Sequence, residues 1–168
     1  MYDVYLGLGS NFGDRLEHLS KAAEEIGKIA RIKKISSVYE TAPVGMNSKH
    51  LFYNLVMEIE TSLDPPILLE QLKSIETKVG RTSMARLQDR EIDIDILLYE
   101  GLQYADETLT VPHRELGNRR FVLEPFSEIA PENVHPTSGA TIATLLTQCK
   151  DHSYACKTEL SIERIHTN

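Results

Sequence analysis

Hydrophobic and polar positions alternate along the chain with two different periods, and these periods predict an ordered series of elements. Stretches rich in branched apolar residues predict strands at residues 2–8, 32–41, 52–61 and 92–99. Apolar residues near helical spacing predict helices at residues 14–29, 65–79, 121–129 and 141–148. Residues 154–162 are a candidate for a final strand.

Residues with strong turn or capping preferences mark the ends of these elements. Asp14 is expected to begin the first helix, and Asp64 to cap the second, whose first turn holds two prolines. Gly80 is the expected C-cap of that second helix. The pair Glu100-Gly101 is expected to turn the preceding strand into a short hairpin with residues 102–104.

The order of the elements is strand, helix, strand, strand, helix, strand, followed by a helical tail. This is the split βαβ pattern of a ferredoxin-like α/β sandwich, an α+β fold with a mainly antiparallel sheet and helices packed on its faces. We expect a single domain over residues 1–168, with about 149–168 as a C-terminal extension. Because many activities share this fold, the function must be argued from the site residues.

Composition narrows the classes of function. The net charge of −7 argues against broad binding to nucleic acid or to an anionic membrane. The longest apolar runs are far shorter than a membrane span, and the N-terminal residues lack the pattern of a signal peptide. Cys149 and Cys156 form no C-x-x-C motif and predict neither a metal site nor a disulfide. A reduced, cytoplasmic setting is therefore expected.

The segment Arg90–Tyr99 is the most informative part of the chain, because its predicted strand carries two acids, Asp93 and Asp95. Residues i and i+2 of a strand point to the same face, with Cα atoms roughly 6.5 Å apart. Two neighbouring carboxylates repel each other unless a cation lies between them, and Mg²⁺ prefers oxygen ligands shared with substrate phosphates. The acids therefore predict a magnesium site. The alternative is the solvent-facing side of a half-buried strand.

Basic residues gather in the sequence on both sides of this acid pair. Because arginine binds phosphate oxygens through a bidentate fork, such a group favours a multiply charged anion as ligand. His113 is a candidate donor to a phosphate or a ribose hydroxyl. The alternative is a set of solvated charges and surface salt bridges. The basic residues are Arg81, Arg86, Arg90, His113, Arg114, Arg119 and Arg120.

Aromatic and amide side chains indicate a slot for a flat heterocycle. Phe52 and Phe121 are candidates to sandwich a ring, while Asn54 hydrogen-bonds its polar edge. The loop Thr41–Gly45 would border this slot; the alternative is that both phenylalanines are core residues. No Walker P-loop occurs in the sequence, and the glycines near residues 7–13 are interpreted as a tight turn.

Taken together, these motifs resemble the 6-hydroxymethyl-7,8-dihydropterin pyrophosphokinase (HPPK) family over about residues 2–136. The matching pieces follow the order of that family. They are Leu8–Asn11, Ser37–Thr41 with Pro43 and Gly45, Phe52–Asn54, Ile75–Glu76 with Gly80–Arg81, Asp89–Leu97, Leu109–His113, Asn118–Arg119 with Phe121, and Glu128–Pro131.

The resemblance implies an activity and assigns roles to residues. ATP would donate its β,γ-pyrophosphoryl group to the hydroxymethyl group of the pterin and release AMP, a step of folate biosynthesis, with two Mg²⁺ ions held by Asp93 and Asp95. Arg81 and Arg90, with these two acids, would be the catalytic residues of a monomeric enzyme. The implied pterin pocket is Thr41, Pro43, Val44, Phe52, Asn54 and Phe121; the implied ATP contacts are Glu76, Arg81, Arg90, Thr110, His113 and Arg119.

The chain also departs from the family pattern. Many members carry a tryptophan and then Gly-Pro or Ala-Pro before the arginine that precedes the acids, whereas this chain has Arg86–Asp89 there and no tryptophan. Thr108 and Arg114 stand where many members have a basic and an aromatic residue, respectively. The loops at residues 43–49 and 82–89 are predicted to be mobile lids that exclude water during the reaction.

Two other functions share some of these features. A non-catalytic ferredoxin-like module for nucleotides or single-stranded RNA would need exposed aromatic residues and a basic face, which the charge of −7 disfavours. A metal-dependent phosphodiesterase would use the same acid pair but would need no pterin acceptor.

Overall fold

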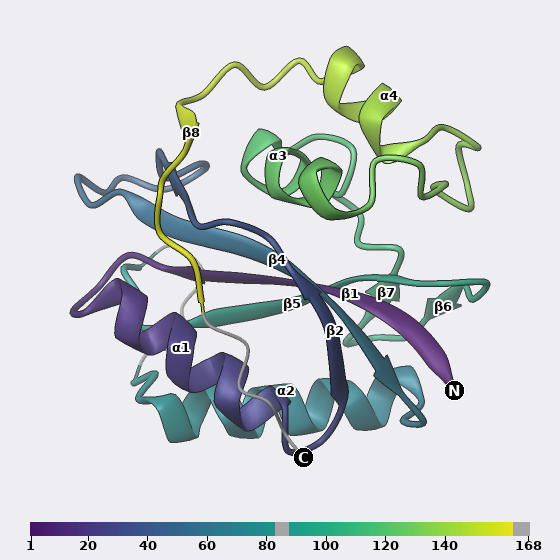
Figure 1. Ribbon diagram of the computed structural model, residues 1–168, viewed down its shortest axis with the longest axis horizontal. Helices are drawn as coiled ribbons and strands as arrows, with labels where there is room; N and C mark the ends of the chain where they lie inside the picture. The colour runs from purple at the N-terminus through teal and green to yellow at the C-terminus, as the bar shows by residue number, and fades with distance from the viewer. Residues whose placement is uncertain (83–87, 163–168) are drawn as a thin grey trace.

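The computed structural model describes residues 1–82 and 88–162 and consists of one main sheet with helices on both faces (Figure 1). The strands are β1 Tyr2–Ser10, β2 Arg31–Ile35, β3 Tyr39–Thr41, β4 Phe52–Thr61, β5 Asp93–Tyr99, β6 Tyr104–Ala105, β7 Thr110–Val111 and β8 Ala155–Lys157. The helices are α1 Arg15–Ile26, α2 Pro65–Val79, α3 Arg120–Ile129 and α4 Ile142–Gln148.

The main sheet has the strand order β5-β1-β4-β3-β8, and β2 pairs with the other half of β4. All its pairings are antiparallel. The units β1-α1-β2 and β4-α2-β5 form the two halves of a split βαβ arrangement. The predicted α+β sandwich with a mainly antiparallel sheet is therefore confirmed.

The alternation of side chains along the strands creates an apolar core on each face of the sheet. Leu6 and Leu8 of β1 lie in the core beneath α1 and α2, whereas Tyr5 lies in the core beneath α3 and α4. Figure 1 shows the two helix pairs on opposite sides of the sheet. Phe126 of α3 is fully buried against Tyr5, and burying such a ring stabilises the fold by about 1.5–3 kcal/mol.

The predicted helix boundaries are largely correct. Asp14 accepts a hydrogen bond from the backbone N–H of Glu17 and so caps α1. Asp64 occupies the N-cap position of α2, but its side chain makes no capping bond and instead accepts from the Tyr2 hydroxyl. Gly80 ends α2 with φ of 128°, a conformation that favours glycine.

Three expectations about strands need correction. The predicted strand over residues 32–41 is split at Ser36, whose hydroxyl accepts the N–H of Val56 in place of a backbone carbonyl. Leu102 makes a single bridge with Tyr99, and the hairpin is instead formed by β6 and β7. The candidate strand at 154–162 is limited to β8, which pairs with β3 at the edge of the main sheet.

Among the described residues, no helix is long and apolar enough to cross a bilayer.

Candidate active site

The acid pair Asp93 and Asp95 lies at the start of β5, opposite two glycines of β1. The register pairs Asp93 with Gly9 and Asp95 with Gly7, and on the other side Gly9 pairs with Asn54 of β4. Because glycine has no side chain, the amide of Asn54 extends over Gly9, where a Cβ atom would collide with its Oδ1. The acids and the amide therefore share one face of the sheet.

A buried arginine holds the first acid in place. Arg81, whose side chain is 7% exposed, donates through Nη1 to Asp93 Oδ1 at 3.0 Å and to Glu76 Oε2 at 3.1 Å. Arg90 Nη1 lies 3.7 Å from the other oxygen of Asp93. Two guanidinium groups thus balance the charge of Asp93.

Glu76 connects helix α2 to this part of the sheet. Its Oε1 accepts the backbone N–H of Ile94 at 2.8 Å, between the two acids. Burial raises the pKa of Glu76, while the bond from Ile94 and the charge of Arg81 act in the opposite direction. The side chain therefore fixes β5 against α2 and adds a third carboxyl group next to the acid pair.

Asp95 has a strongly perturbed environment. Burial, followed by the charges of Asp93 and Glu76, raises its pKa from 3.8 to about 7, whereas the charges of Arg119 and Arg90 oppose the shift. Within residues 1–82 and 88–162, no side chain or backbone group donates a hydrogen bond to its carboxyl group. A cation beside the acid pair would relieve this repulsion, so the carboxylate set fits a hard divalent ion such as Mg²⁺.

The acid pair provides only part of a coordination sphere. No cluster of three or more His, Cys, Asp or Glu suited to a metal occurs among the residues that the structure describes. Mg²⁺ is usually bound by one or two carboxylates, with water and substrate phosphates completing the octahedron. The site therefore fits an ion that arrives with a phosphate-bearing ligand.

Polar and aromatic residues of β3, β4 and α3 lie beside the acid pair. Asn54 Nδ2 donates to Thr41 Oγ1 at 2.6 Å, which fixes the orientation of the amide. The guanidinium of Arg90 lies 5.6 Å from the ring centre of Phe52, and that of Arg119 lies 5.7 Å from the ring centre of Phe121. Phe52 and Phe121, two of the pterin residues implied by the resemblance, therefore lie next to arginines that are expected to bind phosphate. In the loop after β3, Pro43 is partly exposed and Val44 is exposed.

A cluster of Asn11, Ser48, His50 and Asp89 joins three loops near the site, and it was not predicted from the sequence. Asp89 accepts from Ser48 Oγ at 2.5 Å and from Asn11 Nδ2 at 2.9 Å, and its other oxygen lies 2.5 Å from His50 Nδ1. The Arg90 N–H donates to Asn11 Oδ1 at 2.8 Å, so the same cluster fixes the backbone of Arg90. Its one signal in the sequence is Asp89 itself, an acid directly before Arg90.

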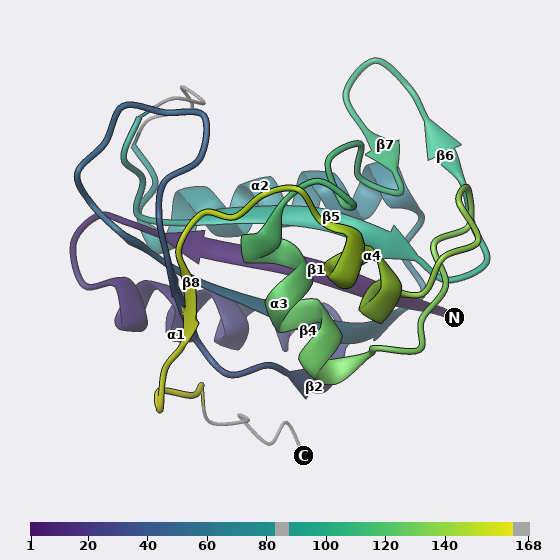
Figure 2. The ribbon, with the colours of Figure 1, turned by 90° about the horizontal axis from the view of Figure 1, so that it is seen from above.

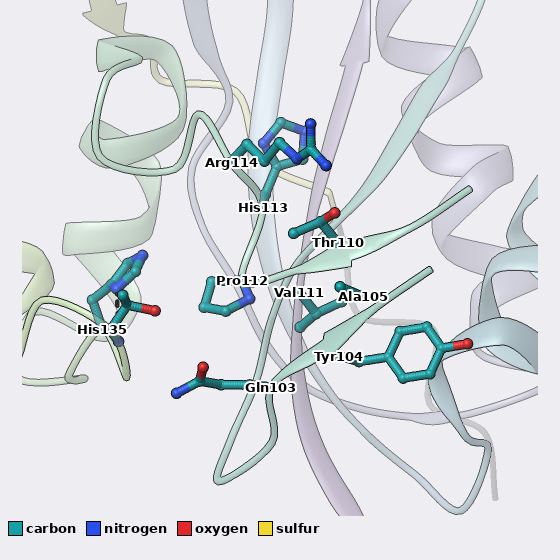
Figure 3. Close-up of a pocket in the computed structure, with 10 residues that line it drawn as sticks. Gln103, Tyr104, Ala105, Thr110, Val111, Pro112, His113, Arg114 and His135 are labelled. Carbon is teal, nitrogen blue, oxygen red and sulfur yellow. Dashed lines mark hydrogen bonds between the residues drawn. The ribbon is translucent and has the colours of Figure 1, made fainter. Parts of the chain in front are cut away.

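Thr110 lies on β7 of the small β6-β7 sheet, and His113 follows that strand and contacts Leu97 of β5. They line a cavity of about 500 Å³ with Gln103, Arg114 and His135, which surround it from several sides in Figure 3. The backbone N–H of His113 donates to Leu97 O, and the ring nitrogen Nδ1 accepts from Glu115 N–H at 3.1 Å. This second bond leaves the proton of the neutral ring on Nε2, which makes Nε2 a hydrogen-bond donor.

Part of the predicted lid cannot be placed. Arg86 and Leu87 lie outside the described residues, and of the loop 82–89 only Thr82, Gln88 and Asp89 are described. The mobility of both loops stays a prediction.

Comparison with known proteins gives consistent results. Residues 5–131 match the family model for 7,8-dihydro-6-hydroxymethylpterin-pyrophosphokinase. A 2-amino-4-hydroxy-6-hydroxymethyldihydropteridine pyrophosphokinase from Aquifex aeolicus is 44% identical over 136 residues, which cover 81% of this chain and 85% of that protein. The Bacillus subtilis protein of the same name is 42% identical over 131 residues, covering 77% of this chain and 78% of that one.

Solved structures share the fold. A Plasmodium falciparum HPPK-DHPS structure with pteroate superposes with a TM-score of 0.74 at 17% identity, covering 88% of this chain. This chain spans 44% of that longer protein. The family model covers well over half of the sequence and agrees with the relatives above. The chain therefore belongs to the 7,8-dihydro-6-hydroxymethylpterin-pyrophosphokinase family.

Proposed function

We propose that Asp93 and Asp95 form the metal site at which this chain transfers pyrophosphate from ATP to the hydroxymethyl group of 6-hydroxymethyl-7,8-dihydropterin. The bond between the α- and β-phosphates of ATP breaks, AMP leaves, and the pterin oxygen takes up the β,γ-pyrophosphoryl group. The observation that carries this proposal is the acid pair on one strand face, between Arg81 and Arg90, with the pKa of Asp95 raised by burial and neighbouring carboxylates.

The carboxylates of Asp93 and Asp95 would hold Mg²⁺, and we propose two ions. Such ions neutralise phosphate oxygens and align the attacking and leaving groups. Arg81 and Glu76 keep the Asp93 carboxylate in a fixed position, so it need not reorganise when ATP binds. The Asp95 carboxyl group must lose its proton to act as a ligand, which makes cation binding stronger as the pH rises toward 7.

Basic residues would bind the phosphates. Arg90 and Arg119 lower the pKa of Asp95 through their charge, so both are close enough to act on an anion bound at the acid pair. Because charge shifts toward the α-phosphate as AMP leaves, fixed guanidinium groups there would stabilise the transition state more than the ground state. Thr110 and the Nε2–H of His113 are the proposed contacts to the remainder of ATP, together with Glu76.

The pterin would bind between β4 and the start of α3. Phe52, which is 9% exposed, and Phe121, which is partly exposed, would flank a flat ring. Asn54 would bind the polar edge of the ring through the amide groups that do not bond to Thr41. Pro43 and Val44 would close the slot from the loop after β3. This arrangement directs the hydroxymethyl group toward the acid pair, because Asn54 and Asp93 lie on the same face on either side of Gly9.

A product assay tests the proposed reaction. The protein is incubated with ATP, Mg²⁺ and the reduced pterin, and nucleotides are separated by chromatography. We expect AMP in equal amount to the pterin consumed, and no AMP without pterin. Formation of ADP, or release of AMP at the same rate without pterin, would contradict pyrophosphoryl transfer and favour a phosphodiesterase.

Replacing Gly9 by alanine is expected to weaken pterin binding by about tenfold or more. The new Cβ would collide with Asn54 Oδ1 and displace the amide, at a cost of the order of one buried hydrogen bond. Gly7→Ala is the matched control, because its Cβ would meet only the flexible end of Leu97 at 3.4 Å. Pterin affinity measured by fluorescence titration should therefore fall in the first variant much more than in the second; equal losses would contradict the assigned role of Asn54.

The stability of the metal-free protein should depend on Asp95 between pH 4 and 7. The pKa of Asp95 is raised from 3.8 to about 7, so the folded state binds a proton that the unfolded state releases. This contribution is complete below pH 4 and is lost as the pH rises through 7. Urea unfolding in EDTA should show the stability of Asp95→Asn increasing relative to the natural chain from pH 5 to 7.5. Parallel pH curves would disprove the raised pKa.

Other expectations remain predictions. The monomeric state and the cytoplasmic location rest on the sequence and the family resemblance. Membership of the family gives no support to the alternative of a non-catalytic RNA-binding module, and the net charge of −7 also argues against it.

A further inference from the structure

The segment after α4 makes a contact with the start of helix α3. Asp151 Oδ2 accepts the backbone N–H of Arg120 at 3.0 Å, across 31 residues of sequence. Arg120 is the first residue of α3, and the side chain of Arg119, which occupies the N-cap position, makes no capping bond. Asp151 therefore supplies the acceptor that this helix lacks locally, and its negative charge is favourable at a helix N-terminus.

Three residues later the same segment contacts the end of strand β3. Tyr154 O accepts the N–H of Ala42 at 2.9 Å, and Ala155 pairs with Thr41 at the beginning of β8. Lys157, at the end of β8, forms an ion pair with Glu128 of α3, with 3.3 Å between Nζ and Oε1. In Figures 1 and 2 the chain runs from α4 to β8 at the edge of the main sheet. We name residues 149–157 the C-terminal strap.

Two contacts of the strap, Asp151 with Arg120 and Tyr154 with Ala42, adjoin the proposed pterin slot. Arg120 stands between Arg119 and Phe121, and Ala42 stands between Thr41 and Pro43. One wall of the slot belongs to α3 and the other to β3 and β4, so the strap connects the two walls through bonds only three residues apart. The strap contacts described above end on α3 and on β3, whereas the network of Arg81, Glu76 and Asp93 joins α2 to β5.

We propose that Asp151 is a positioning residue that sets the distance between the two walls of the pterin slot, an inference that rests on the proposed function of that slot. Burial alone would raise the pKa of Asp151, but hydrogen bonds from Ser153 and Arg120 lower it below its ordinary value. Asp151 is thus charged at neutral pH and holds the first turn of α3, including Phe121, against the strap. The family model ends at residue 131, before this segment.

The first test compares Asp151→Ala with the conservative Asp151→Asn, and uses His152→Ala as control because His152 is exposed and adjacent. Loss of a cap of this kind predicts a rise in the KM for pterin of about five- to tenfold in Asp151→Ala, with kcat and the KM for ATP changing less than about twofold. Asp151→Asn keeps an acceptor oxygen and should recover most of the pterin affinity. His152→Ala should behave like the natural chain.

A second pair of variants removes the donor instead of the acceptor. Arg120→Pro deletes the N–H at the first helical position, where proline is well tolerated, and Arg119 already has the extended φ of −123° and ψ of 111° that the residue before a proline prefers. Arg120→Ala keeps the N–H and controls for loss of the side chain. We expect the proline variant, and not the alanine variant, to reproduce the rise in the KM for pterin.

The outcomes separate the inference from the function on which it rests. If the natural chain binds no pterin in direct fluorescence titration, the proposed function fails and the inference fails with it. If the natural chain binds pterin but Asp151→Ala and Arg120→Pro bind it equally well, only the inference is overturned. A proportional loss of kcat and of affinity for both substrates would also overturn it, since that would indicate a purely structural cap. Should Asp151→Ala not fold, the Arg120 pair decides by the same criterion.

Discussion

Replacing Asp95 by asparagine is expected to lower kcat by about a thousandfold or more while leaving pterin affinity within about threefold. The amide keeps the size of the side chain but removes its negative charge and one ligand oxygen. Cations at such a site stabilise the transition state by several kcal/mol, which corresponds to at least three powers of ten in rate. The proposed pterin slot is formed instead by residues such as Asn54 and the two phenylalanines, so pterin binding and turnover should respond differently.

The measurement is AMP release at saturating substrates, combined with pterin titration in the absence of turnover. Glu100→Gln is the control, because Glu100 is an exposed acid directly after the end of β5. It removes one negative charge at the opposite end of the same strand and should leave kcat within about twofold. Turnover of Asp95→Asn near that of the natural chain would remove the acid pair from the reaction.

Replacing Arg81 by methionine is expected to have the largest effect on stability, about 3 kcal/mol in the free energy of unfolding. The guanidinium lies between Glu76 and Asp93, and the side chains of Arg81 and Glu76 are 7% and 6% exposed. Removing it leaves two carboxylates close together without their shared partner, and the one on Glu76 is buried. The methionine retains much of the apolar volume, so the loss reports mainly on charge and hydrogen bonding.

Urea unfolding of three variants tests this explanation. Arg81→Met combined with Glu76→Gln should be more stable than Arg81→Met alone, because one of the unpaired charges is then absent. Lys78→Met is the control: Lys78 forms a 2.6 Å ion pair with Glu25 on the surface, where such pairs contribute little. An Arg81 variant no less stable than the Lys78 variant would contradict the described network.

The parts of the fold that follow local rules were predictable from the sequence. The acid pair is recognisable because a strand places residues i and i+2 on one face, and the buried registers of β1, β4 and β5 preserve that alternation. Helices α1 and α2 were predictable from apolar spacing and from Asp14 and Gly80 at their ends.

The parts that depend on distant contacts were not predictable. The break between β2 and β3 at Ser36 depends on the hydrogen bond that its hydroxyl accepts from Val56. Strand β8 is short because it pairs with the three residues of β3. In the site, Asn11 joins Asp89 across 78 residues, and Asp151 reaches the start of α3 across 31 residues. No local sequence pattern predicts such pairs, because each residue is of a type that is common in its own segment and its partner lies far away in the sequence.

A crystal structure with Mn²⁺ and a non-hydrolysable ATP analogue tests the central assignment most directly, since manganese accepts the same oxygen ligands as magnesium and can be located by its anomalous scattering. We predict a manganese peak bound by carboxylate oxygens of Asp93 and Asp95, with phosphate oxygens of the analogue completing its coordination and Arg81 and Arg90 beside them. Manganese bound away from both acids, with the triphosphate elsewhere on the protein, would contradict the account.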